Sequence, residues 1–162
     1  MSVFEHHPGR RPTAVAPRYL TPASVQRSTS AGPPTPVEGL LRRGVGAVLM
    51  IAVALVHVLD LPGKFTETRY LGIGYIGLIL GSVWVAEMLL RRDSLLAWRA
   101  AGLLAGLTLL GFVIDRTVGL PGATADIGNW FAPLGLASLF VESLAVGLAM
   151  TALARCDADT PD

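Results

Sequence analysis

Five ionisable residues of this sequence stand in, or at the ends of, long apolar stretches, where charged side chains are rare. In chain order they are His57, Asp60, Asp115, Arg116 and Glu142. An ionised group in hydrocarbon costs roughly 2.5–3.5 kcal/mol on insertion scales, so each of these residues requires a physical reason. Together they could bind a cation, carry protons or hold a small polar ligand.

A structural role for the same residues is the alternative. Hydrogen bonds and an ion pair between helices could lock four short helices together. Asp60 and Arg116 could equally cap helix ends in the headgroup layer. Both interpretations stay open from the sequence. Glu87 is different, because Arg91 follows it at the i+4 position near the end of an apolar stretch. This spacing predicts an exposed ion pair on one helix.

Several chemistries lack the residues that they need. His57 is the only histidine in an apolar stretch, which argues against a haem held by two histidines, and no H-E-x-x-H run indicates a zinc hydrolase. Ser138 and Ser143 lack the G-x-S-x-G context of a nucleophile. The single cysteine, Cys156, excludes an internal disulfide. No cofactor is indicated, and the case for an enzyme is weak. One histidine with several carboxylates could still hold a cation, so metal binding is left undecided.

Four apolar stretches must position these residues, at about 44–61, 70–90, 97–118 and 130–154. Each is close to the roughly 20 residues that an α-helix needs to cross about 30 Å of hydrocarbon. The chain of 162 residues is 52% hydrophobic and 15% charged, with a mean hydropathy of +0.55. A soluble domain would carry nearer to a quarter of charged residues. We therefore predict an all-α, polytopic membrane protein, an antiparallel bundle of four transmembrane helices, with the lipid bilayer as its main partner.

The basic residues predict how the chain lies in the membrane. Ten of the 13 lie before the first stretch, between the second and third, near the start of the third (Arg99), or after the fourth; the others are Lys64, Arg69 and Arg116. Lys and Arg gather on the cytoplasmic side of membrane proteins. Both termini are therefore predicted to be cytoplasmic, with the connections 62–69 and 119–129 facing outward. We expect the second connection, up to residue 131, to fold back over the mouth of the bundle.

The domain organisation follows from the same composition. Residues 1–39, rich in Pro, Ser, Thr and Arg, are typical of a disordered cytoplasmic tail, because they cannot bury enough apolar area to order themselves. Residues 40–155 form the predicted transmembrane domain, and residues 156–162 a short cytoplasmic tail. A net charge of +1 gives no reason to expect nucleic acid as a partner.

Small residues indicate where helices approach closely. Gly77 with Gly81, and Gly102 with Gly106, have the small-xxx-small spacing that favours helix packing in lipid. The run 72–77 also matches G-x-G-x-x-G, but no strand precedes it, so we interpret its glycines as packing residues and not as a nucleotide site. Small and polar residues are expected to face the bundle interior, with Glu142 deeper than the other ionisable residues.

The motif Leu-Pro-Gly occurs twice, at 61–63 and 120–122, once in each predicted outer connection. One interpretation is a duplicated helical hairpin. The other is that proline and glycine simply end helices.

Two strings resemble those of a known group of proteins. HVLDLPGKFTETRYLGIGY (57–75) and DRTVGLPGATADIGNWFAPLGLASLFVE (115–142) are similar to strings in uncharacterised small four-span integral membrane proteins of high-GC actinobacteria. The resemblance covers roughly residues 44–154. It implies a bacterial plasma membrane and a four-helix fold, and it implies no activity.

Three kinds of function are compatible with the sequence. The first is binding or sensing, with an outward-facing polar cluster that holds an ion or small ligand. The second is an accessory or structural subunit, in which the helices dock on a larger membrane complex or on further copies of the chain. A small transporter or a membrane-embedded enzyme comes last, because four spans give little room for alternating access and no nucleophile or metal set is recognisable.

Overall fold

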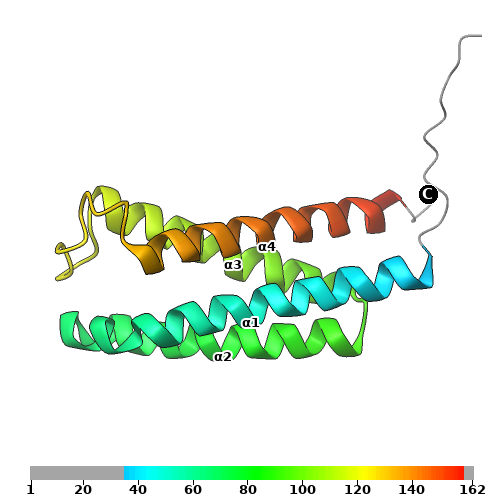
Figure 1. The fold of residues 1–162 in the computed structure, drawn as a ribbon, viewed down its shortest axis with the longest axis horizontal. Helices are drawn as coiled ribbons and strands as arrows, with labels where there is room; N and C mark the ends of the chain where they lie inside the picture. The colour runs from blue at the N-terminus through cyan, green and yellow to red at the C-terminus, as the bar shows by residue number, and fades with distance from the viewer. Residues whose placement is uncertain (1–34, 159–162) are drawn as a thin grey trace, which may run out of the picture. The chain divides into compact units, whose positions relative to one another are not determined.

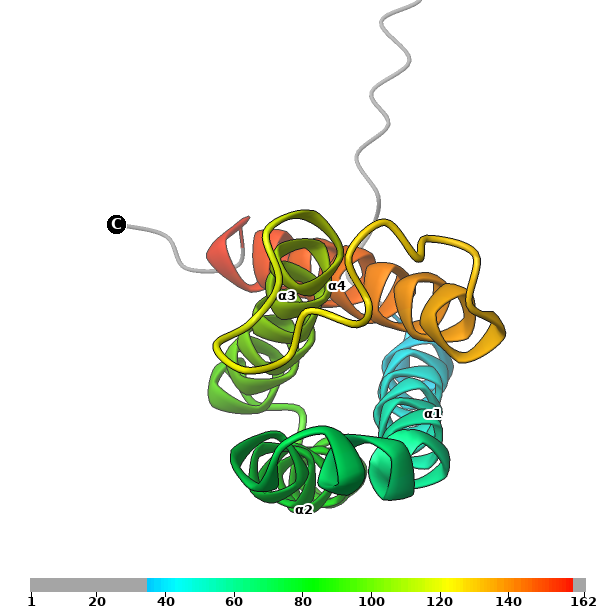
Figure 2. The ribbon, with the colours of Figure 1, turned by 90° about the vertical axis from the view of Figure 1, so that its left-hand side faces the viewer.

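The computed structural model describes residues 35–158, and within that range four α-helices run alternately in opposite directions (Figure 1). They are α1 (Pro36–Glu67), α2 (Arg69–Arg91), α3 (Leu95–Thr117) and α4 (Pro133–Ala158). Seen from one end, they form a ring in which α1 lies between α2 and α4, and α3 lies between α4 and α2 (Figure 2). Each is long and apolar enough to cross a membrane. The predicted all-α, four-helix membrane fold is confirmed.

Helix α1 is longer than the apolar stretch that predicts it. It begins with a capping box, in which Thr35 accepts from the Glu38 backbone and the Glu38 side chain accepts from the Thr35 backbone. Residues 36–39 of the predicted tail are therefore helical. At its other end α1 continues through Pro62 to Glu67, and Thr68 alone separates it from α2. The prediction that 62–69 is a loop is wrong.

The chain remains helical beyond Pro62 because the last turns of α1 make tertiary contacts that stabilise the helix. A proline inside a helix removes one hydrogen bond, a loss that tertiary contacts can offset. Lys64 forms ion pairs with Glu67 and with Asp126 of the α3–α4 connection, and the Phe65 ring packs so closely on α2 that a Cβ at Gly72 would lie 2.5 Å from it. The second Leu-Pro-Gly behaves differently, since it forms a tight turn closed by hydrogen bonds between Leu120 and Ala123.

The hydrophobic core fills one half of the bundle, toward the end where α3 begins. Its largest side chains are Met50, Leu89 and Trp98, and small residues of α3 and α4, among them Ala105 and Ala149, surround them. Trp98, near the start of α3, is only 1% exposed. It packs on Gly46 of α1, where a Cβ would come within 2.9 Å of the indole.

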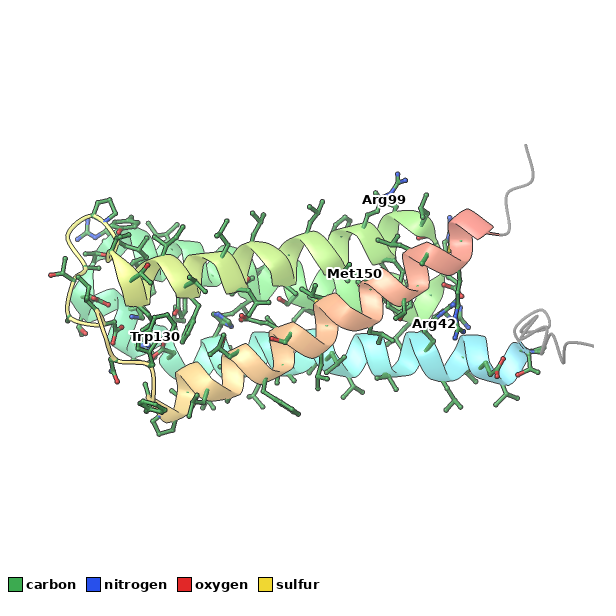
Figure 3. All side chains as sticks on the ribbon, turned by 90° about the horizontal axis from the view of Figure 1, so that it is seen from above. Arg42, Arg99, Trp130 and Met150 are labelled. Carbon is green, nitrogen blue, oxygen red and sulfur yellow. The ribbon has the colours of Figure 1, made fainter. Side chains whose placement is uncertain are left out.

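Polar groups at the edge of this core hold the turn between α2 and α3. The Trp98 indole donates to Asp93 at 2.8 Å, and Arg42 forms an ion pair with the same carboxylate at 2.7 Å. Burial by itself raises the pKa of Asp93, but these hydrogen bonds and the nearby positive charges outweigh it, so the pKa lies below its ordinary value. Arg42 and Arg99 lie at this end and Trp130 at the other (Figure 3).

Large apolar side chains cover the outside of the bundle, among them Leu80, Leu103 and Phe140. Small residues lie between helices: a Cβ at Gly102 would meet the Ala149 Cβ at 3.2 Å, and one at Gly106 would meet Val146 at 4.0 Å. This arrangement, with large residues outside and small ones at the contacts, is typical of helices in lipid. Glu87 and Arg91 form the predicted exposed ion pair, at 2.5 Å.

The other predicted glycine pair lies differently. A Cβ at Gly81 of α2 would meet Leu104 of α3 at an ordinary contact distance of 3.6 Å. A Cβ at Gly77 would meet no atom within 4 Å, and this glycine lines a cavity instead. No contact therefore supports a packing role for Gly77, because the helices separate at this level.

Candidate functional site

A cavity of about 820 Å³ occupies the half of the bundle that the core leaves free. All four helices line it, together with the connection 118–132, which joins α3 to α4 at this end (Figure 2). Most of its wall is apolar, including Leu71, Leu78, Leu104 and Phe112. Tyr75 and Thr108 are uncharged polar residues in the same wall. Of the five sequence-predicted site residues, four line this cavity: His57, Asp60, Asp115 and Arg116.

Glu142 lies behind the cavity, deeper in the bundle. It is fully buried, at 0% exposure, and Ser138 of the same helix donates to its Oε1 at 2.6 Å. Its other oxygen, Oε2, has no hydrogen-bond partner among the described residues. The His57 Nε2 lies 3.7 Å from Oε1, while the His57 Nδ1 lies 2.8 Å from the Val53 carbonyl and can donate to it. Glu142 therefore reaches the cavity only through His57 and Ser138.

Tyr75 of α2 links Asp60 with His57. Its hydroxyl donates to the Asp60 Oδ2 at 3.0 Å, and its ring lies 4.9 Å from the His57 ring, between centroids. Sequence reasoning missed this tyrosine, because it sits in an apolar run without charges. A signal was present, since a tyrosine inside a transmembrane helix needs a partner for its hydroxyl.

Asp126 ties the connection 118–132 to the helices. Its carboxylate lies 2.5 Å from the Lys64 ammonium and 2.7 Å from the Arg116 guanidinium, two cations that are themselves almost fully buried. Burial by itself raises the pKa of Asp126, but the hydrogen bond and charge of Lys64, with those of Arg116, outweigh it and leave the pKa below its ordinary value. We refer to Lys64, Arg116 and Asp126 as the loop lock.

Further contacts hold the same connection across the end of the bundle. Tyr70 of α2 donates to the Pro121 carbonyl at 2.8 Å, and the Gly128 amide donates to the Arg116 carbonyl at 2.9 Å. Gly119, Gly122 and Gly128 have φ near +77°, +75° and +78°, a region that glycine adopts without steric cost. The connection folds back over the mouth of the bundle, as expected from the sequence. The connection therefore covers this end of the cavity.

Asp115 lines the cavity and its hydrogen bonding is incomplete, as is that of Glu142 behind it. Asp115 is 9% exposed as a whole residue. Arg116 reaches its Oδ2 only at 3.4 Å, and its Oδ1 has no partner among the described residues. A buried polar atom without a partner is costly and rare in folded proteins. The Asp115 side chain is 12% exposed, so its weakly paired carboxylate can still attract a positive charge from a molecule in the cavity.

The cavity opens sideways, between α2 and α3. Leu107 of α3 lines it and is nonetheless 65% exposed, and the exposed Gly74 and Gly77 of α2 line it on the opposite side. These two helices contact each other near the turn 92–94 and separate toward the covered end (Figure 1). In a membrane, this opening faces the lipid tails.

The fold and the cavity define a class of protein: a small integral membrane protein with four apolar helices and a mostly apolar cavity that carries a few polar groups. No protein-family model, curated protein or solved structure matches the chain. Within residues 35–158, no group of three or more His, Cys, Asp and Glu side chains is arranged to hold a metal ion.

Proposed function

We propose that this protein binds a small molecule in the cavity between its four helices. The volume of about 820 Å³ lies within the range of small-molecule sites, roughly 300–1,000 Å³. Such sites combine mostly apolar walls with a few convergent polar groups, and this cavity has both. The predicted ion or ligand site at His57, Asp60, Asp115, Arg116 and Glu142 is thereby extended to Tyr75 and to the apolar wall.

One observation carries the proposal: the Asp115 carboxylate lines the cavity, and its one side-chain partner among the described residues is Arg116, at 3.4 Å. Asp93 and Asp126 have a short hydrogen bond or ion pair at each carboxylate oxygen, whereas Asp115 has one contact, at 3.4 Å. A bound molecule would supply the missing partner.

A thermal-shift screen of the full chain in lipid nanodiscs tests the proposal, with small organic compounds of each charge type. At a concentration of 100 times Kd, a ligand stabilises the folded state by about 2.7 kcal/mol, which corresponds to a rise in Tm of several degrees. Leu107→Trp places an indole in the side opening and should abolish the rise. Leu103→Trp, one turn away on the same helix and as exposed as Leu107 at 65%, should retain it. Equal rises in both variants, or no compound that raises Tm, would contradict a ligand site in the cavity.

We further propose that the protein lies in a bacterial plasma membrane with both termini in the cytoplasm. Support comes from the uneven arginines, since Lys64, Arg69 and Arg116 lie at the covered end of the bundle and the other basic residues of the described range at the opposite end. With Cys156 replaced by Ala, an Ala125→Cys variant should react with a membrane-impermeant maleimide on intact cells. A Val37→Cys variant should react only after lysis. The reverse pattern would invert the assigned orientation.

A further inference from the structure

We infer that the cavity takes an amphipathic organic cation, whose positive group pairs with Asp115 and whose apolar body lies between α2 and α3. This inference rests on the proposed function. It names the chemical class of the ligand, which neither the sequence nor the volume of the cavity determines.

The charge balance at the covered end favours a cation. Lys64 is already engaged by Glu67 and Asp126, and Arg116 by Asp126 and Asp115. An anionic ligand would have to displace Asp126 from one of these buried cations. Four carboxylates lie at this end, against these two cations and the exposed Arg69: Asp60, Glu67, Asp115 and Asp126. A cation could approach the Asp115 carboxylate, whose side chain is 12% exposed, without displacing Asp126.

The other groups around Asp115 are also compatible with a positively charged ligand. Across the cavity, α1 presents His57, Asp60 and Lys64, and α2 presents the Tyr75 hydroxyl, which donates to Asp60 and leaves its ring toward the cavity. Aromatic faces attract ammonium and guanidinium groups, which adds to the attraction of the carboxylate. The remaining basic residue of this end, Arg69, is exposed and does not line the cavity.

The walls indicate that the cation is organic and not a metal ion. A volume of about 820 Å³ is far larger than one hydrated ion needs, and no metal-binding group of side chains occurs in residues 35–158. Metal ions of the hard type require several oxygen ligands at once. Leucines and Phe112 instead offer apolar contact to the body of a larger ligand.

The position of the side opening also indicates that the ligand has an apolar body. Leu107, Gly74 and Gly77 place the entrance on the lipid-facing surface, whereas the loop lock and the Tyr70–Pro121 hydrogen bond cover the end of the bundle. A molecule that partitions into the bilayer can reach this entrance directly. A strongly hydrated ion would first have to cross lipid.

Two rigid ions of matched size and opposite charge test the charge requirement. Tetraphenylphosphonium and tetraphenylborate are titrated into the full chain in nanodiscs of zwitterionic lipid. We expect saturable binding of the cation, with binding of the borate at least tenfold weaker. Asp115→Asn keeps the shape of the side chain and should weaken the cation at least tenfold, while Glu87→Gln, an exposed carboxylate outside the cavity, should leave it unchanged.

A second measurement keeps the test decisive if Asp115→Asn does not fold. A carbodiimide with a small amine modifies accessible carboxyl groups of the wild-type chain, and mass spectrometry locates the modified residues. Tetraphenylphosphonium should protect Asp115 in a saturable way and leave Glu87 equally reactive. No protection of Asp115, or equal binding of phosphonium and borate, would overturn the cationic class. If a neutral or anionic compound binds and Leu107→Trp blocks it, the cavity remains a ligand site and only its charge preference is wrong.

Discussion

An Asp126→Asn variant is expected to lose roughly 3 kcal/mol of unfolding free energy, close to the lower end of the range for breaking a buried ion pair. The loss arises because Lys64 and Arg116 keep their charges, 8% and 7% exposed as side chains, while their shared carboxylate disappears. Glu67 and Asp115 compensate only in part, since the Arg116–Asp115 distance is 3.4 Å. Thermal unfolding in nanodiscs measures the effect.

Glu87→Gln is the matched control for this variant. It removes a carboxylate from an ion pair of similar length, 2.5 Å to Arg91, but both partners are more than half exposed. Exposed pairs contribute about 0–1 kcal/mol, so this change should be close to neutral. Equal losses in the two variants would mean that the loop lock stabilises the protein no more than a surface pair does.

The same lock predicts how stability depends on pH. Asp126 lies outside the membrane-spanning helices, and its pKa in the folded protein is below the ordinary aspartate value of 3.8. The stabilisation is therefore fully present above that ordinary value and is lost as pH falls through the lower folded value. The Tm of the wild-type chain should fall over this acid range more than that of Asp126→Asn, and parallel profiles would contradict the assignment.

Trp98→Ala is expected to lower the unfolding free energy by at least as much, by about 3–5 kcal/mol, which is the range for truncating a buried aromatic side chain. Trp98 is 1% exposed, packs on Gly46 and Leu89, and donates to Asp93. Its removal leaves a cavity between α1 and α3 and frees the turn that Asp93 holds. The unfolding free energy in detergent or nanodiscs provides the measurement.

Two other variants separate packing from hydrogen bonding at this position. Trp84→Ala removes the same side chain from a position 58% exposed on the outside of α2, and its cost should be well below 1 kcal/mol. Trp98→Phe keeps much of the ring but loses the hydrogen bond to Asp93, so an intermediate loss of about 1–2 kcal/mol is expected. A Trp98→Ala chain as stable as Trp84→Ala would show that the core does not depend on this residue.

The fold was predictable because each helix is a long apolar run, and length with hydropathy suffices to recognise such runs. The exact ends of α1 were not predictable. The pair Pro62-Gly63 is typical of a helix end. The helix extends to Glu67 because of a contact between residues far apart in the sequence, Lys64 and Asp126. The burial of Trp98 was not predictable for a similar reason, since its neighbour Gly46 lies on another helix.

The polar cluster was predictable in its members but not in its connections. Charges inside apolar runs identified Asp115 and Glu142, because any such charge needs a partner. Which of them faces a cavity depends on how α2 and α3 separate, and periodicity within one helix does not determine this. Asp126 was missed because a carboxylate in a loop is ordinary until its partners are known to be buried.

The central claim is that the Asp115 carboxylate receives its missing partner from a molecule held between α2 and α3. A crystal structure of the chain purified with its native lipids tests this most directly. We predict non-protein density in the side opening that ends against the Asp115 carboxylate. A cavity closed by repacked helices, or an Asp115 Oδ1 paired with a donor of the protein itself, would contradict the claim.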